Sequence, residues 1–335
     1  MDLPSNKRIL SAAQPTGEAH IGNYLGAFKQ WVALQDAGND VCAMIADLHA
    51  ITAPYDAATF PNTTLRMAAL LMAVGLDPKK SVVFIQSHVP AHTEAAWLLT
   101  TITPVGDLTR MTQYKDKAKK QKTVGAGLLN YPTLMAADIL LYQTEIVPVG
   151  EDQTQHLEFA RTLARKFNRQ FGKTFTEPRA FVLEETARIM SLTDPTRKMS
   201  KSDLPASRIG LLDDPSAIPR KIRAAVTDSG TAVNPKKLGP ALTNLLTIFA
   251  TFSEKPFRDV AEEYAGLGYA VVKSALADLL VDRLAPIRNR AEELLWDHGE
   301  LQRILADGAE RAATLANKTL VTMRKRMGLL LPQNE

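Results

Sequence analysis

Short runs of β-branched and apolar residues alternate with longer amphipathic segments in the first half of the chain, and this alternation restricts the fold more than any other feature. The expected strands are residues 8–12, 41–47, 82–86 and, with a weaker signal, 145–149. The helical patterns between them cover residues 23–35, 60–74 and 92–101. Strands separated by helices of this length are typical of βαβ units in a parallel sheet, which binds ligands at the carboxyl ends of its strands.

The second half has a different pattern, because the strand signal fades after about residue 204. Helices are expected at residues 215–226, 239–252, 260–264, 271–295 and 301–330. Pro286 inside the fourth of these predicts a break or a kink. The polar stretch 198–205 joins the halves and is expected to be a loop. The sequence therefore predicts an α/β protein, with a Rossmann-like parallel-sheet domain at 1–204 followed by an α-helical domain at 205–335.

Composition narrows the classes of site and partner. The single cysteine, Cys42, excludes an intrachain disulfide and any structural zinc or iron–sulfur site built on several thiolates. The 40 basic and 36 acidic side chains give a net charge of only +4, so a polyanionic partner would require that the positive charges cluster. Apolar runs such as 68–74 are far shorter than the ~20 residues that span a bilayer, and the N-terminus lacks a signal-peptide pattern. We expect a reduced, cytoplasmic protein that is not bound to a membrane.

Two segments carry polyphosphate chemistry, although neither is a G-x-G-x-x-G turn or a P-loop. The first, Q-P-T-G-E-A-H-I-G-N at 14–23, follows the first strand and opens a helix. Glycines there let a nucleotide approach the backbone, and the helix N-terminus offers free N–H groups to phosphate. An ordinary glycine-containing loop is the alternative.

The second segment is K-M-S-K-S at 198–202, which places two lysines three residues apart among serines. Such a loop would form a cationic clamp for a polyphosphate. A solvated basic linker is the alternative interpretation. The presence of both segments in this order on one chain makes coincidence a poor explanation.

The two segments resemble the H-I-G-H and K-M-S-K-S signatures of class I aminoacyl-tRNA synthetases, the first with Asn23 at its fourth position. Further blocks look like those of bacterial tryptophanyl-tRNA synthetases, and the resemblance runs along nearly the whole chain. These blocks lie at residues 47–52, 110–117, 131–140, 147–153 and 225–229. The chain departs from the family pattern at Thr16, where a serine is usual, and at Leu10, where a larger apolar side chain is usual.

The resemblance implies ATP-dependent ligation of L-tryptophan to tRNA(Trp) through a tryptophanyl-adenylate, with release of AMP and pyrophosphate. ATP is then a substrate that carries Mg²⁺ on its phosphates, and no residue is assigned as a metal ligand. The resemblance also implies a homodimer. In the predicted helical domain it implies recognition of the tRNA anticodon, with the last helix packed back on the catalytic domain.

Candidate residues around the nucleotide follow from the residue types and from the resemblance together. An imidazole at the helix mouth can donate to the α-phosphate, and lysines can neutralise charge on pyrophosphate. The catalytic candidates are His20, Lys117, Lys198 and Lys201. The ATP-binding candidates are Gln14, Pro15, Thr16, Gly22, Asn23, Gly150, Glu151, Asp152, Ile189, Lys198, Met199, Ser200, Lys201 and Ser202. Glu151 or Asp152 would alternatively complement the dipole of the helix that follows.

The tryptophan site is expected around a helix that begins near Pro132 and presents residues 131, 135, 138 and 142 on one face. A buried carboxylate at Asp138 needs a donor, which is either a structural partner or a ligand. The resemblance assigns the indole N–H to it. The tryptophan-binding candidates are Asp138, Tyr131, Met135, Gln153, His49, Leu10, Val147 and Val149. His49 is equally readable as a structural histidine.

Three other functions remain open from the sequence. A tyrosyl-tRNA synthetase would need partners for a phenol hydroxyl, and no block resembles that arrangement. An RNA-binding relative without ligase activity would not need both signature segments intact. A small-molecule nucleotidylyltransferase would leave the long helical second half without a purpose.

Overall fold

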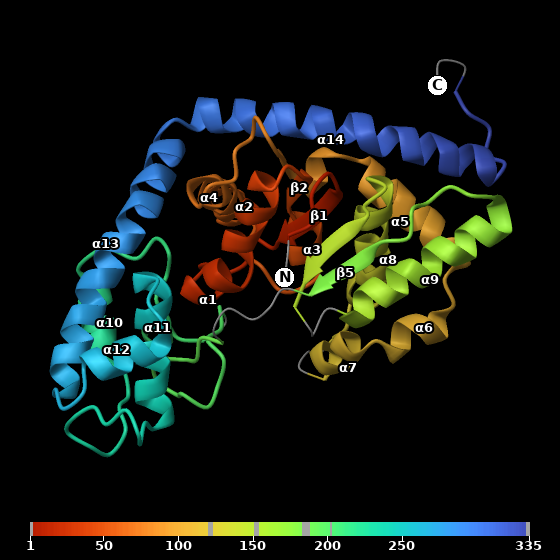
Figure 1. Cartoon of the computed structure of the whole chain (residues 1–335). Helices are drawn as coiled ribbons and strands as arrows, with labels where there is room; N and C mark the ends of the chain where they lie inside the picture. Colours follow the sequence, from red (N-terminus) through yellow and green to blue (C-terminus); the bar gives the residue numbers. More distant parts are fainter. Residues whose placement is uncertain (1–2, 120–122, 151–153, 183–187, 202, 333–335) are drawn as a thin grey trace.

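The computed structural model describes residues 3–119, 123–150, 154–182, 188–201 and 203–332 (Figure 1). Five parallel strands form one sheet in the order β3-β2-β1-β4-β5. They are β1 Arg8–Ala13, β2 Asp40–Ile45, β3 Val82–Ile85, β4 Ile146–Val149 and β5 Arg179–Val182. The predicted α/β class and the first four strands are confirmed, and β5 was not predicted.

The strand order places a topological switch at the centre of the sheet. From β1 the chain moves outward through β2 and β3 on one side and then returns to β4 on the other. Leu10 pairs with Cys42 of β2, and Ile9 pairs with Ile146 of β4. Because the crossovers depart in opposite directions, a crevice opens at the carboxyl ends of β1 and β4, where open α/β sheets bind ligands.

Helices cover both faces of this sheet. The first predicted helix is a continuous helical run of α1 Ile21–Asn23, a π-type segment η1 Tyr24–Phe28 and α2 Lys29–Asp36. The others in this half are α3 Asp47–Ala50, α4 Phe60–Ala73, the short 3-10 helix η2 Gln86–His88, α5 Ala91–Ile102, α6 Val105–Arg110, α7 Thr112–Ala118, α8 Ala126–Leu141 and α9 Thr154–Phe171.

The expected start of α8 near Pro132 is wrong, because the helix begins at Ala126 and Pro132 lies in its interior. Proline removes one backbone donor from a helix, and its ring crowds the carbonyl four residues earlier. The nine other buried residues of α8 make up for that loss through packing against α5 and α9.

The second half is helical, as expected. Its elements are the 3-10 turn η4 Pro205–Ser207, α10 Ala217–Ala224, α11 Pro240–Ser253, α12 Phe257–Glu263, α13 Tyr269–Trp296 and α14 His298–Arg326. Pro286 does not break α13, which is one continuous helix of 28 residues with the proline in its interior. Buried Leu284 and Ile287 on either side of the proline anchor that stretch of the helix.

Helix α14 leaves the helical group and runs back across the sheet half of the molecule (Figure 1). It packs on β3 and α5. The approach is close enough that a Cβ on Gly308 would lie 1.9 Å from the carbonyl oxygen of Val83, so only glycine fits at this position. Among the described residues, no helix is long and apolar enough to cross a membrane.

Candidate active site

A cavity of about 320 Å³ occupies the crevice at the switch point between β1 and β4. Its walls come from the carboxyl halves of three strands and from α8, with single side chains from α2, α3 and α7. The lining residues are Leu10, Ser11, Ala12, Gln14, Trp31, Met44, Ala46, His49, Gln113, Tyr131, Met135, Asp138, Ile139, Val147, Pro148, Val149 and Gly150. A mostly apolar cavity with a few polar groups is typical of a small-molecule site.

The structure brings together seven of the eight residues expected to bind the amino acid. They come from four separate segments of the chain and line this one cavity: Leu10, His49, Tyr131, Met135, Asp138, Val147 and Val149. The eighth, Gln153, lies outside the described residues. Tyr142, expected on the same helix face, does not line the cavity, because its hydroxyl lies 2.8 Å from Nε2 of His92.

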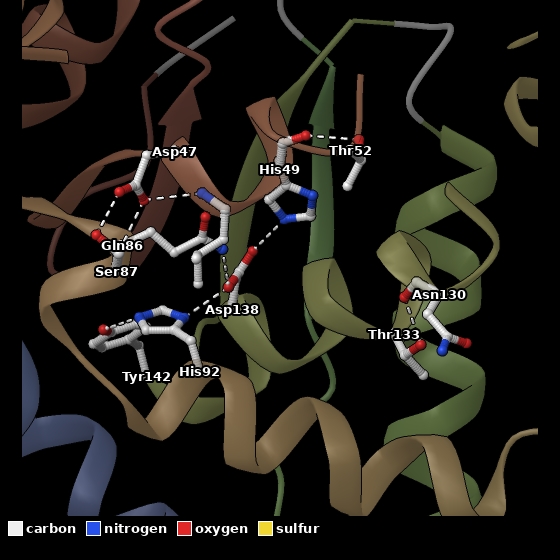
Figure 2. A network of polar contacts seen from close by, with 11 residues as sticks. Asp47, His49, Thr52, Gln86, Ser87, His92, Asn130, Thr133, Asp138 and Tyr142 are labelled. Atoms are coloured by element: carbon white, nitrogen blue, oxygen red, sulfur yellow. Dashed lines mark hydrogen bonds and ion pairs between the residues drawn. The ribbon is translucent and has the colours of Figure 1, made fainter. Parts of the chain in front are cut away.

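Asp138 lies in the cavity wall with only 2% of its surface exposed. Its Oδ2 is 2.7 Å from His49 Nε2, and its Oδ1 is 2.6 Å from His92 Nδ1 (Figure 2). Gln86 donates a third hydrogen bond to Oδ1 at 2.8 Å. Burial alone would raise the pKa of Asp138, but the hydrogen bonds and charges of the two histidines outweigh burial and hold the pKa at about 2. The carboxylate is therefore ionised at neutral pH and acts only as an acceptor.

Tyr131 lines the cavity from the same helix as Asp138, about two turns earlier. Its hydroxyl is 2.6 Å from His156 Nε2 and 3.3 Å from Gln113 Oε1. Burial raises the pKa of Tyr131 to about 12, so the hydroxyl stays neutral and can donate or accept. Gln113, which the sequence did not single out, thereby joins the polar groups of the cavity.

His20 caps the N-terminus of the helix after β1. Its Nδ1 accepts a hydrogen bond from Gly22 N at 3.1 Å, while Asn23 Oδ1 accepts from His20 N at 3.1 Å. Burial, followed by the charges of Lys201, Arg208 and Lys198, lowers the pKa of His20 to about 4. The ring is thus neutral at pH 7, and because Nδ1 accepts, its proton is on Nε2. That N–H is a donor available beside the helix mouth.

The two signature segments lie against each other although about 180 residues separate them. Gly17 has φ +59°, and a Cβ there would lie only 3.2 Å from the carbonyl oxygen of Lys201. Residues 188–199 fold into a hairpin in which Met199 N donates to Ile189 O at 3.1 Å. Residue 210 then pairs with His20 as an isolated bridge. Backbone contacts between these distant segments therefore hold the lysine loop beside the histidine turn.

The remaining candidates for ATP binding differ in where the structure places them. Gln14 and Gly150 line the cavity, whereas Pro15, Ile189 and Met199 are buried and support the two segments. Glu151, Asp152 and Ser202 lie outside the described residues. Lys117 belongs to α7, but its side chain is not among those described.

Besides Gln113, the residues that sequence reasoning missed are Gln86, His92 and Arg208. Gln86 follows β3 directly, so its place at a strand's carboxyl end was the available signal. Arg208 is 6% exposed, donates to the backbone carbonyl of Asp203, and lies 4.0 Å from Glu18. It links Glu18 of the first signature segment to Asp203, which directly follows the second.

The pKa of Lys201 predicts a pH dependence for ATP binding. Burial lowers this pKa to about 8, and polyphosphate binds the protonated ammonium. Above pH 8 the free protein loses this proton and must recover it on binding, so the Kd for ATP should rise by up to about tenfold per pH unit. Calorimetric titration between pH 7 and pH 9.5 measures this slope.

Lys201→Arg is the control, because a guanidinium stays charged throughout this range. The variant should bind ATP with a Kd that hardly changes with pH. A flat profile in the unmodified protein, or the same slope in both proteins, would contradict the role given to this ammonium.

A family model described as tRNA synthetases class I (W and Y) matches residues 4–285. This agrees with the parallel sheet, the cavity at its switch point and the adjoining signature segments, and the chain belongs to this family. The letters W and Y in that description stand for tryptophan and tyrosine. The similar proteins carry the name tryptophan–tRNA ligase. The relative from Caldanaerobacter subterraneus is 50% identical over 329 residues, covering 97% of this chain and 99% of its own. That from Clostridium acetobutylicum is 47% identical, with 99% and 100% covered.

Solved structures give the same result. The tryptophanyl-tRNA synthetase from Campylobacter jejuni complexed with ADP and tryptophan superposes with a TM-score of 0.87 at 36% identity, covering 96% of this chain and all of that one. The enzyme from Mycoplasma pneumoniae gives a TM-score of 0.85 at 34% identity, with 97% and 98% covered. A tyrosyl-tRNA synthetase from Aeropyrum pernix, at 21% identity and a TM-score of 0.67, shares the fold alone.

Proposed function

We propose that the chain ligates L-tryptophan to tRNA(Trp) in two steps, using ATP as its magnesium complex. The observation that carries the proposal is the cavity at the switch point. It places an ionised carboxylate, Asp138, in a mostly apolar wall, and Gln14 of the first signature segment lines it as well. Wide, mostly apolar walls with a buried carboxylate acceptor suit an indole, which has a large ring and one N–H.

In the first step, the tryptophan carboxylate attacks the α-phosphorus of ATP in line, and the bond to the bridging oxygen breaks to release pyrophosphate. The substrate supplies its own nucleophile, so the protein has to orient the reactants and stabilise charge. Lys198 and Lys201 neutralise charge that moves onto pyrophosphate, and Lys117 adds to them by family resemblance. The Nε2–H of His20 donates to the α-phosphate, beside Gly22 and Asn23 at the helix mouth.

In the second step, a terminal ribose hydroxyl of the tRNA attacks the carbonyl carbon of the adenylate and releases AMP. We assign the adenosine to the strand end at Gly150 with Glu151 and Asp152, and the amino group of the substrate to Tyr131 and Gln153. The domain division stays as proposed from the sequence, with catalysis at 1–204 and anticodon recognition at 205–335.

Attachment of tryptophan to tRNA(Trp), measured with labelled amino acid, tests the proposal. We expect attachment that requires ATP and proceeds with tryptophan only. A chain that binds tRNA without charging it would be a regulatory relative. Adenylate formation without transfer to tRNA would instead indicate a small-molecule nucleotidylyltransferase.

We further propose a homodimer in the cytoplasm, where charged tRNA is used in translation. Trp97 on α5 is 68% exposed, and Val105 at the start of α6 is 65% exposed. These two apolar side chains are close in the chain and exposed, so they are suited to pack against a second copy of the chain.

Trp97→Glu should therefore convert the dimer to a monomer in light scattering. Trp296→Glu is the control, since Trp296 is 91% exposed on α13, and it should leave the dimer intact. A monomeric unmodified protein would rule out this assembly.

A further inference from the structure

The carboxylate of Asp138 accepts hydrogen bonds unevenly on its two oxygens. Oδ1 accepts from Gln86 and from His92, whereas Oδ2 lies against His49 Nε2 (Figure 2). Each carboxylate oxygen has about two acceptor positions. Oδ1 is therefore saturated, and Oδ2 has one position left among the described residues.

The remaining acceptor position lies on the side of the cavity. His49, the partner of Oδ2, lines the cavity together with Asp138. Gln86 and His92, the partners of Oδ1, are fully buried and do not line it. The saturated oxygen therefore points into the core, and the unsaturated one points to the space where a ligand lies.

His92 is held by a partner of its own. An ionised carboxylate can only accept, so Nδ1 of His92 must donate to Asp138. Nε2 of His92 lies 2.8 Å from the hydroxyl of Tyr142. Tyr142 is 1% exposed and packs against Phe84 of β3, with ring centroids 5.7 Å apart. The ring of His92 thus links the hydroxyl of Tyr142 to the carboxylate of Asp138 in one relay.

We propose that Gln86, His92 and Tyr142 are specificity-determining positioning residues, which fill Oδ1 of Asp138 so that only Oδ2 is left to accept one N–H from the bound ring. None of the three touches the ligand. They act by fixing the orientation of the carboxylate, so a loosened relay lets Asp138 turn and weakens the discrimination for an N–H donor. The inference rests on the proposed function, because it assumes that tryptophan occupies the cavity.

Tyr142→Phe tests the relay with the smallest change, since it keeps the ring and removes only the hydroxyl. The KM for tryptophan in ATP–pyrophosphate exchange should rise about fivefold, as for one neutral hydrogen bond, while kcat and the KM for ATP change little. Preference for tryptophan over the analogue with sulfur in place of the indole N–H should fall by a similar factor. His92→Leu removes the donor to Asp138 and should have the larger effect on both quantities.

Two further variants separate positioning from a loss of stability. His92→Asn keeps an amide donor near the position of Nδ1 and should recover most of the preference. Thr133→Val removes another buried hydrogen bond of α8, from Thr133 Oγ1 to Asn130 O at 2.7 Å (Figure 2). It should lower Tm while leaving the KM and the preference unchanged.

The inference is overturned if Tyr142→Phe and His92→Leu keep the KM for tryptophan and the preference within twofold of the unmodified protein. It is also overturned if Thr133→Val changes them as much as Tyr142→Phe does. An unmodified protein without tryptophan-dependent exchange would instead overturn the proposed function, and the inference with it.

Discussion

Replacement of Lys201 by alanine is expected to lower kcat for tryptophan activation about 10²-fold or more, as removal of a donor aimed at developing charge does in other enzymes. The ammonium lies on the loop beside the His20 turn, and the charge it meets develops on pyrophosphate as the bond breaks. Its contribution is therefore larger in the transition state than in the ground state. Tryptophan affinity measured without ATP should hardly change.

Pre-steady-state measurement of adenylate formation gives this kcat, and Lys318→Ala is a matched control. Lys318 is an exposed lysine of α14, so its loss should leave activation unchanged. Intact activation in Lys201→Ala, with weaker tRNA binding alone, would make the loop an RNA contact and would contradict the assignment.

Asp138→Ala is expected to cost roughly 1–3 kcal/mol in tryptophan activation, the range for losing a hydrogen bond to a charged group. Tryptophan differs from other aromatic amino acids at its buried end by one N–H donor on a wider ring. A site rejects a ligand without that donor when its own buried acceptor is left unpaired. The sulfur analogue of tryptophan should therefore bind the unmodified protein poorly, and that penalty should largely vanish in the variant.

The two changes form a double-mutant cycle in kcat/KM, and their losses should not add, since both remove one interaction. Asp138→Asn provides a second variant that keeps the volume and one acceptor, in case the three unpaired donors around an alanine prevent folding. Additive losses in both cycles would mean that Asp138 is a structural aspartate and that the indole is recognised elsewhere.

The strands of the first half were predictable because each is a short apolar run between helices of clear period. β5 escaped prediction because it is four residues long, Arg179–Val182, and pairs only with β4 at the sheet edge. The order of the strands depends on contacts between distant segments, so no local pattern encodes it. The start of α8 was misplaced since proline is common in the first turn of a helix, whereas here Pro132 lies in the interior.

The same distinction between local pattern and distant contact holds for the residues of the candidate site. The residues proposed to touch a ligand, such as His20 and Asp138, lie in segments that the sequence singled out. Gln86 and His92 act through a partner 52 and 46 residues away in the chain, and their immediate neighbours carry no pattern for that role. Such partners become visible only when the fold brings α5 and β3 against α8.

ATP–pyrophosphate exchange driven by each aromatic amino acid in turn tests the central claim most directly. It needs neither tRNA nor a variant, and it reports the chemistry assigned to the cavity and the two signature segments. The account predicts rapid exchange with tryptophan and, because the phenol and phenyl rings lack the indole N–H, only background exchange with tyrosine and phenylalanine. Exchange driven better by tyrosine, or absent with all three, would contradict it.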